Sequence, residues 1–290
     1  MIAKDFQFYR PTHLSEALDL LGQDLGDVKV LAGGMSLVPA MNLGIVRPDA
    51  VVSLNHVSSL DAVVHDRDQL RLGALVRHRR IETDRQIRAA CPLLAEAAGL
   101  IADVQVRHRG TVGGSLVHAD PAANYVPVMV ALAARFRLMS RTGERWVDAR
   151  NFFLGLLETD VEPEEILTDI VVPVQTTSQS SAYYRLARVH GNFAIVNAAA
   201  VVAHDAWARV VIGGAAAKPI VVEERFGDYG GSSVQLIDHL GDAVYAACSE
   251  ALEDLQGSAE YRRSMARVVA RRTVAEALRR YDASRKKEQP

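Results

Sequence analysis

The 290-residue sequence contains only two cysteines, Cys91 and Cys248, which lie far apart along the chain. Two cysteines cannot supply the ligands of an iron–sulfur cluster or a zinc site, and they cannot form a disulfide framework. The formal net charge is −2, so the strongly basic balance typical of nucleic-acid-binding proteins is missing. We therefore predict a chain without a metal site of its own and without a nucleic-acid partner.

Targeting segments and long apolar runs are also missing. The first residues, Met1–Phe6, lack the charged-then-apolar pattern of a signal peptide, and no apolar run approaches the length of a membrane span. We therefore expect a cytoplasmic protein with no membrane span. Apolar residues make up 49% of the chain and charged residues 23%, which is typical of a globular protein long enough for two domains.

Two glycine pairs, each followed by a hydroxyl residue, are the most informative feature that is present. The first glycine segment, Ala32–Ser36, follows the strand-like residues Val28–Leu31. The second glycine segment, Gly110–Ser115, follows Arg107 and Arg109 and precedes the apolar run Ala122–Ala134, which we interpret as a buried helix. Neither segment is a G-x-G-x-x-G fingerprint, and the absence of any Gly-Lys dipeptide excludes a P-loop.

Glycine permits φ > 0 and a close approach of the backbone to a ligand, so such segments can direct several N–H groups at one anion. Each glycine pair alone could equally be a tight turn. Together, the two segments could hold one diphosphate from both sides.

Apolar periodicity and turn residues predict the other elements. We expect strands at Phe6–Pro11, Val28–Leu31, Val51–Leu54, Leu70–Ala74 and Ile166–Pro173, a hairpin of Phe136–Met139 with Arg145–Val147, and helices at Ser15–Leu21 (capped by Ser15) and Leu93–Ala102. After a linker at Thr176–Ser181, we expect strands at Tyr183–Ala187, Phe193–Ala203 and Ala208–Ile212, helices at Val234–Leu255 and Tyr261–Tyr281, and a disordered tail at Arg285–Pro290. The last helix carries seven arginines, which form either a solvated face, the interpretation that we favour, or a docking surface for an acidic partner: Arg262, Arg263, Arg267, Arg271, Arg272, Arg279 and Arg280.

Both glycine segments belong to longer motifs that resemble a known family. Ala-Gly-Gly-x-Ser-Leu-x-Pro-x-Met at Ala32–Met41, followed by Arg47-Pro48, resembles the first flavin loop of the FAD-binding (medium) subunit of molybdenum hydroxylases, the xanthine dehydrogenase and carbon monoxide dehydrogenase family. Arg-Gly-Thr-Val-Gly-Gly-Ser-Leu-x-His-Ala-Asp-Pro-Ala at Arg109–Ala122 resembles the second loop, and the resemblance covers nearly the whole chain.

The resemblance implies an α+β fold with two domains. Residues 1–175 would form a PCMH-type FAD-binding domain, whose two αβ subdomains (about 1–57 and 58–175) sandwich FAD. Residues 176–290 would form a C-terminal flavoprotein domain with a small antiparallel sheet and helices.

The same resemblance implies which residues bind FAD. The diphosphate would be gripped from one side by Ala32, Gly33, Gly34, Met35 and Ser36, and from the other by Thr111, Val112, Gly113, Gly114 and Ser115. Asn124 stands where many relatives have an aspartate, Ile166 or Leu167 matches a backbone contact near the flavin, and Arg185 replaces a frequent lysine.

Four further residues are matched to that family's pattern or considered for chemistry of their own. Arg188–Ala194 resembles Arg-x-x-Gly-Asp-Phe-Ala with Asn192 in place of the acid. Phe193 within it is either a strand residue of the core, which we favour, or a ring that borders the flavin. His118 and Asp120 resemble an acid–base pair, but we interpret them as residues that tie the loop or cap the next helix, and we assign no catalytic residue.

The implied function is that of a FAD-dependent oxidoreductase subunit. Electrons from a molybdenum cofactor in a large subunit would pass through 2Fe-2S clusters in a small subunit to the FAD of this chain, which would reduce an external acceptor. Two alternatives remain: a self-sufficient FAD-dependent oxidoreductase of the same fold, and a flavin- or nucleotide-binding scaffold without turnover. The substrate cannot be inferred from this chain, because it would meet molybdenum elsewhere.

Overall fold

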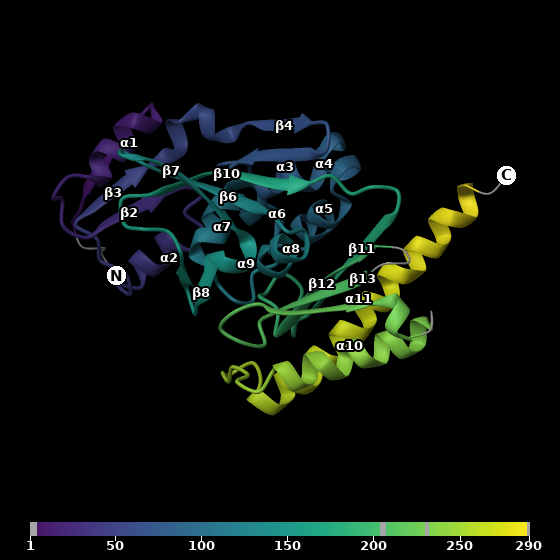
Figure 1. Cartoon of the computed structure of the whole chain (residues 1–290). Coiled ribbons are helices and arrows are strands. Elements are labelled where there is room, and N and C mark those ends of the chain that lie inside the picture. The colour runs from purple at the N-terminus through teal and green to yellow at the C-terminus, as the bar shows by residue number, and fades with distance from the viewer. Residues whose placement is uncertain (1–4, 204–206, 230–231, 289–290) are drawn as a thin grey trace.

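The computed structural model describes residues 5–203, 207–229 and 232–288. Figure 1 shows the N-terminal half of the chain at one side of the molecule and the two longest helices, α10 and α11, at the other. The described strands form three main sheets and one two-stranded hairpin, which confirms the α+β class. No helix in these ranges is long and apolar enough to cross a membrane.

The first sheet is parallel and has the order β1-β3-β2. It contains β1 (Gln7–Tyr9), β2 (Val28–Leu31) and β3 (Ala50–Ser53), with α1 (Leu14–Leu21) and α2 (Leu37–Asn42) in the crossovers and η1 (Leu54–His56) and η2 (Ser58–Asp61) after β3. Helix α1 packs Ala17, Leu18 and Leu21 against Val52 of β3. It begins earlier than predicted, because His13 and not Ser15 occupies the N-cap position, where Glu16 accepts the His13 N–H.

The second sheet is antiparallel, with the order β4-β5-β10-β6-β7. Its strands are β4 (Val63–Asp66), β5 (Gln69–Gly73), β6 (Arg135–Ser140), β7 (Gly143–Asp148) and β10 (Ile166–Pro173). The intervening segments form α3 (His78–Thr83), α4 (Arg85–Ala90), α5 (Pro92–Gly99), α6 (Val104–Arg109), α7 (Val112–His118), α8 (Tyr125–Ala131), α9 (Ala149–Phe152) and the hairpin β8 (Phe153–Gly155) with β9 (Glu158–Thr159). Apolar side chains of this sheet and of α3–α5, α7 and α8 share one buried core.

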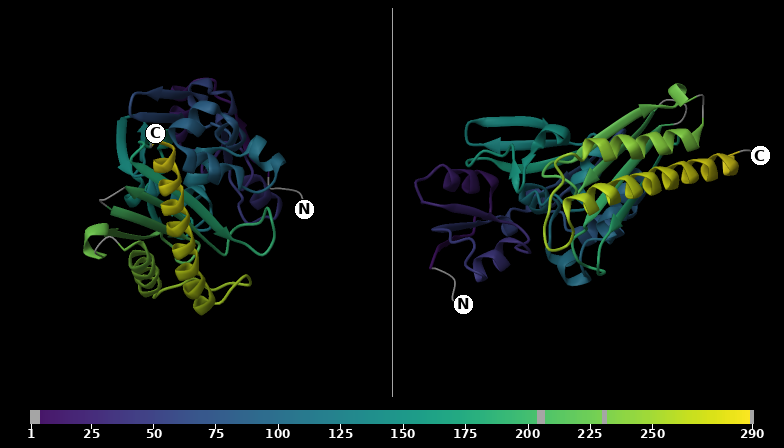
Figure 2. Two further views of the ribbon diagram at one scale, coloured as in Figure 1. Left: turned by 90° about the vertical axis from the view of Figure 1, so that its right-hand side faces the viewer. Right: turned by 90° about the horizontal axis from the view of Figure 1, so that it is seen from below.

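The third sheet is antiparallel and follows chain order, from β11 (Gln179–Leu186) through β12 (Val196–Ala203) and β13 (Trp207–Gly213) to β14 (Ile220–Arg225). After η3 (Phe226–Tyr229), helices α10 (Ser233–Ala247) and α11 (Ala259–Glu288) complete the chain. Figure 2 shows α10 and α11 side by side along this sheet, where α11 contacts β11, β12 and β13. Helices α5 and α8 contact strands of the same sheet and join it to the core of the second sheet.

Most predicted strands are confirmed, and β2 and β10 match their predicted bounds to the residue. Several predicted boundaries are wrong. The linker is shorter than Thr176–Ser181, because Gln179–Ser181 already pair with β12. The helix predicted at Leu93–Ala102 ends at Gly99, and the one predicted at Val234–Leu255 ends at Ala247.

The C-terminal helix also differs from its prediction. Arg285–Glu288, predicted to be disordered, continue α11, whereas Gln289 and Pro290 lie outside the described residues. The division into domains 1–175 and 176–290 stays a prediction.

The seven arginines predicted to form a solvated face or a docking surface differ in exposure: Arg272 and Arg279 are exposed, as on a solvated face, and each of the seven has a partner within the chain. Arg262 is buried and donates to the carbonyls of Ile195 and Gly214. The others pair with side chains or backbone of α10, β11, α5 or α11 itself: Arg263 with Tyr245, Arg267 with Asp242, Arg271 with Asp238 and Asp242, Arg272 with Tyr184, Arg279 with Glu276, and Arg280 with Glu96 and Glu276.

Arg280 connects α11 to α5. Its two terminal nitrogens donate to both carboxylate oxygens of Glu96 at 2.7 and 2.8 Å, and Nη1 also donates to the Ser181 carbonyl at 3.0 Å. Such a bidentate pair fixes relative position as well as adding stability. The C-terminal helix is therefore fastened to the part of the chain that carries the second glycine segment.

Candidate functional site

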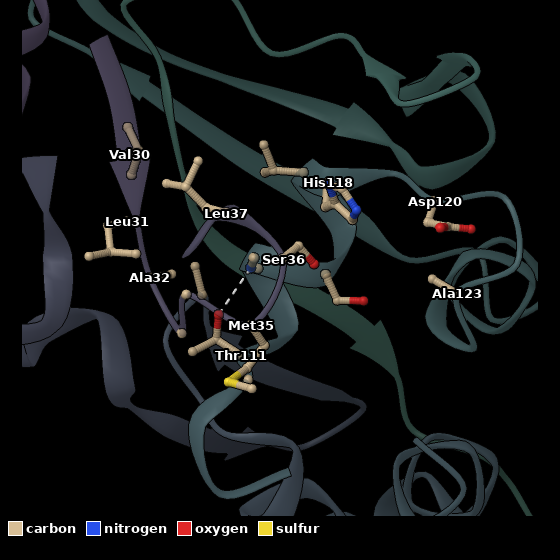
Figure 3. Close-up of a pocket in the computed structure, with 18 of the residues that line it drawn as sticks. Val30, Leu31, Ala32, Met35, Ser36, Leu37, Thr111, His118, Asp120 and Ala123 are labelled. Atoms are coloured by element: carbon tan, nitrogen blue, oxygen red, sulfur yellow. Dashed lines mark hydrogen bonds between the residues drawn. The ribbon is translucent and has the colours of Figure 1, made fainter. Parts of the chain in front are cut away.

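A cavity of about 580 Å³ lies where the first sheet, the second sheet and the end of β11 come together. It is lined by every predicted FAD-binding residue except Val112, which is fully buried. These residues are Ala32, Gly33, Gly34, Met35, Ser36, Thr111, Gly113, Gly114, Ser115, Asn124, Ile166, Leu167, Arg185 and Phe193. Figure 3 shows the first glycine segment lying beside the start of α7, with His118 and Asp120 farther along the wall.

The first glycine segment offers unpaired donors. Within the described part of the chain, none of the N–H groups of Gly33, Gly34, Met35 and Ser36 donates to a protein acceptor. Gly34 has φ +75°, a left-handed conformation that glycine adopts without strain, and Ser36 is the N-cap of α2. Clustered free amides of this kind form an anion-binding concavity.

The second glycine segment differs from the prediction of a φ > 0 loop, because Val112–His118 is the helix α7 and neither Gly113 nor Gly114 has positive φ. Its amides are already engaged: Val112 N donates to Val76 O, Gly113 N to Ala74 O, and Gly114 N to the Thr111 hydroxyl at 3.1 Å, the bond that Figure 3 marks. Thr111 is thus the N-cap of α7. This wall can therefore offer the Ser115 hydroxyl rather than a set of free amides.

The glycines of the two segments serve packing as much as ligand approach. A Cβ on Gly33 would lie 2.4 Å from the Arg109 carbonyl oxygen and 2.8 Å from Gly110 Cα. A Cβ on Gly113 would lie 2.5 Å from Ala74 Cβ. Arg107, which precedes the second glycine segment, directs its charge away from the cavity: it donates to Glu82 at 3.0 Å and to the carbonyl of Ile101.

The wall formed by Asn124, Arg185 and Phe193 is polar and partly open. Asn124 is 7% exposed, and its amide donates to the Ala97 carbonyl at 2.9 Å. Arg185 donates to the carbonyls of Leu100 and Asn192. The interpretation of Phe193 as a core strand residue is wrong, because it precedes β12 and is 51% exposed at the cavity.

His118 and Asp120 both line the cavity, yet their contacts agree with a structural role. Asp120 Oδ1 accepts the Ala122 N–H at 2.8 Å and so holds the turn between α7 and α8. His118 is the last residue of α7. Among the described residues, no hydrogen bond or ion pair joins the His118 and Asp120 side chains, so the geometry gives no acid–base pair.

His78 is a cavity residue that sequence reasoning missed. Its side chain is buried, Nδ1 lies 3.2 Å from the Tyr125 hydroxyl, and Nε2 faces Gly110. Burial, together with the charges of Arg77 and Arg107, lowers the pKa of His78 to about 3. The imidazole is therefore neutral at pH 7 and acts as part of the cavity wall.

The cavity suits a long ligand with chemically different parts. Apolar side chains line one region, including Val30, Leu31 and Leu54, and the unpaired amides adjoin them. Asn124, Arg185 and Phe193 border another region. The volume lies in the range of about 300–1,000 Å³ typical of cofactor sites, and a diphosphate would satisfy the free N–H groups of the first glycine segment. In the described ranges, no group of three or more His, Cys, Asp or Glu side chains is placed to hold a metal ion.

Comparisons with known proteins agree with this geometry. Residues 4–175 match the family described as "FAD binding domain in molybdopterin dehydrogenase", and residues 181–277 match "CO dehydrogenase flavoprotein C-terminal domain". The chain is 33% identical to the 6-hydroxypseudooxynicotine dehydrogenase complex subunit alpha of Paenarthrobacter nicotinovorans, with 95% of each chain covered. It is 35% identical to the caffeine dehydrogenase subunit beta of Pseudomonas sp. (strain CBB1), again with 95% of each chain covered.

A solved structure extends the similarity to the whole fold. A chain of the carbon monoxide dehydrogenase from Hydrogenophaga pseudoflava, in a form that lacks the Mo-pyranopterin moiety of its cofactor, superposes with a TM-score of 0.89 at 32% identity, covering 97% of this chain and 99% of that one. These relatives are oxidoreductase components whose names identify them as subunits of complexes or enzymes. The chain therefore belongs to the FAD-binding medium subunits of the molybdenum hydroxylases.

Proposed function

We propose that the chain holds FAD in this cavity and serves as the electron-transfer subunit of a multi-subunit molybdenum hydroxylase. In this role it passes electrons from iron–sulfur clusters on a partner chain to an external acceptor. The observation that carries the proposal is the row of four unpaired amides at Gly33–Ser36, in a cavity that brings fourteen of the fifteen predicted residues together. When bound, FAD supplies the redox chemistry, and the protein binds and orients it.

The predicted residues would contribute to FAD binding in different ways. The amides of Gly33–Ser36 would donate to the diphosphate, with the Ser115 hydroxyl on the opposite side. Val112, Gly113 and Thr111 would act indirectly, because their groups already hold α7 in place. Asn124, Ile166, Leu167, Arg185 and Phe193 would border the rest of the cofactor, with Arg185 contributing positive charge.

The partner chains follow from the chemistry that this chain does not supply. Two cysteines, both buried and unlinked, cannot ligate a 2Fe-2S cluster. We therefore propose a small subunit with 2Fe-2S clusters and a large subunit with the molybdenum cofactor. The relatives act on different compounds, to judge from their names, so we propose no substrate; the cytoplasmic location stays a prediction.

Co-expression with the neighbouring genes tests the proposal. We expect a complex that contains FAD, molybdenum and iron, in which substrate reduces the flavin anaerobically. The isolated chain should bind FAD, and aldehydes, aromatic heterocycles and carbon monoxide should leave its flavin oxidised. Flavin reduction by the lone chain at the rate of the complex would favour the self-sufficient oxidoreductase. A bound flavin that no donor reduces, even in the complex, would favour the scaffold.

A further inference from the structure

A chain of hydrogen bonds outside the cavity links the two glycine segments. Asn55, in η1, donates through Nδ2 to the Ala32 carbonyl at 2.8 Å and to the Ser53 hydroxyl at 3.1 Å. Arg77, just before α3, donates through Nη2 to Asn55 Oδ1 at 2.9 Å and through Nη1 to the Arg109 carbonyl. The Arg77 guanidinium thus bonds to Arg109, directly before the second glycine segment, and is linked through Asn55 to the first. The two segments are also in contact, where Gly33 lies against Arg109 and Gly110.

Arg77, like Arg185, bonds to neutral oxygens, whereas several other partly buried arginines of the chain bond to carboxylates. Arg137, Arg145 and Arg280 each pair with carboxylates. Arg77 is half-buried and bonds only to neutral oxygens, and no carboxylate of the described residues forms an ion pair with it. Burial, and then repulsion from Arg109, lowers its pKa from the usual arginine range. The Asp61 carboxylate attracts this cation but forms no ion pair with it, so an anion bound nearby would stabilise it further.

The position of Asn55 connects this cation to the free donors of the cavity. The Ala32 carbonyl that accepts from Asn55 belongs to the same peptide unit as the Gly33 N–H, and that N–H has no protein acceptor. A hydrogen bond to the carbonyl of a peptide polarises the unit and makes its N–H a stronger donor. The charge of Arg77 strengthens Asn55 as a donor in the same way.

We propose that Asn55 and Arg77 are positioning residues for the diphosphate: they fix the peptide plane of Ala32–Gly33 and transmit the positive charge of Arg77 to the Gly33 N–H. Neither side chain lines the cavity, so both act through the backbone. The inference rests on the proposed binding of FAD, and it adds the residues that give the first glycine segment its affinity for a diphosphate.

The test compares ligands with and without the diphosphate. Competition with FAD on the flavin-free full chain gives the affinities of ADP and adenosine for the wild type and for two variants. Arg77→Met removes the charge and both bonds. Asn55→Asp keeps an acceptor for Arg77, as an ion pair that supports the fold, but it cannot donate to the Ala32 carbonyl. Arg80→Met is the matched control, because Arg80 lies on the same part of the chain and bonds to Asp61 instead of either segment.

We expect both variants to lose about tenfold in ADP affinity, which is about 1.4 kcal/mol, with adenosine affinity unchanged, because the diphosphate then meets a weaker donor at Gly33. The Arg80→Met protein should bind both ligands like the wild type. An unchanged ratio of ADP to adenosine affinity in Asn55→Asp, in a protein that is folded by circular dichroism, would overturn the inference while leaving FAD binding intact. A wild-type chain that binds neither FAD nor ADP would instead overturn the proposed function and the inference with it.

Discussion

Replacing Gly33 by alanine tests the contact on which the shape of the cavity depends. The added Cβ would lie 2.4 Å from the Arg109 carbonyl oxygen, whereas ordinary contacts begin at 3.4 Å, so the two segments must separate by about 1 Å. The neighbouring backbone is held in place, since Gly110 N donates to Val106 O at 2.7 Å and His78 N donates to Gly110 O at 3.1 Å. We expect a loss of about 1–3 kcal/mol in the free energy of unfolding, the usual cost of overpacking.

Urea unfolding followed by circular dichroism measures that loss, and flavin fluorescence measures FAD affinity, which we expect to fall about tenfold as amide contacts are displaced. Gly227→Ala is the control, because a Cβ there meets nothing within 4 Å, and its unfolding free energy should change by less than about 0.5 kcal/mol. If the Gly33→Ala protein unfolds and binds FAD like the wild type, the two glycine segments do not touch as described.

Three further changes probe other parts of the structure. Asn192→Asp adds a carboxylate to the cavity wall, which should weaken binding of the anionic reduced flavin relative to the oxidised form. The flavin potential should then fall by about 30 mV for each tenfold loss in this relative binding. An equal or higher potential in a spectroelectrochemical titration contradicts this. Arg280→Met removes the bidentate pair with the partly exposed Glu96 and should cost about 1 kcal/mol in denaturant unfolding, whereas Arg279→Met, which loses only a contact to Glu276, should cost less. His78 has a pKa of about 3 in the folded chain, against 6.5 in the unfolded chain. The free energy of unfolding should therefore fall by about 1.4 kcal/mol per pH unit as the pH falls from 6.5 towards 3, because only the unfolded chain takes up a proton there. A His78→Gln protein that keeps the wild-type slope in this window refutes the assignment.

Local sequence signals predicted the bounds of those strands that end at a proline or a glycine segment. The β-branched run of β10 ends at Pro173, which cannot continue a strand interior, and β2 ends where the first glycine segment begins. The two glycine motifs also predicted the cavity walls, because short-range spacing is enough to place their residues in one segment. Which of their amides are free depends on the rest of the fold and had to come from the structure.

The sequence predictions were wrong where contacts between residues far apart in the sequence determine the structure. Glycine is a poor helix former, so Gly113–Gly114 indicated a loop. Thr111 caps a helix there instead, and Gly113 is needed within it because Ala74 leaves no space for a Cβ. The spacing of the α11 arginines indicated a basic face but not their partners, since nothing in it reveals Glu96, which precedes Arg280 by 184 residues. Asn55 and Arg77 were missed for the same reason, because polar residues in loops do not disclose their partners.

The place of β10 in the second sheet has a consequence for biosynthesis. β10 lies between β5 and β6, yet it is the last strand of this sheet to leave the ribosome. Until it arrives, β4–β5 and β6–β7 are separate hairpins with unpaired edges, which can pair with strands of other nascent chains. At about 5–20 residues per second, the roughly 30 residues from the end of β6 to the end of β10 take about 2–6 s to synthesise. A lower growth temperature, and chaperones that shield strand edges, should therefore raise the yield of this chain in a heterologous host.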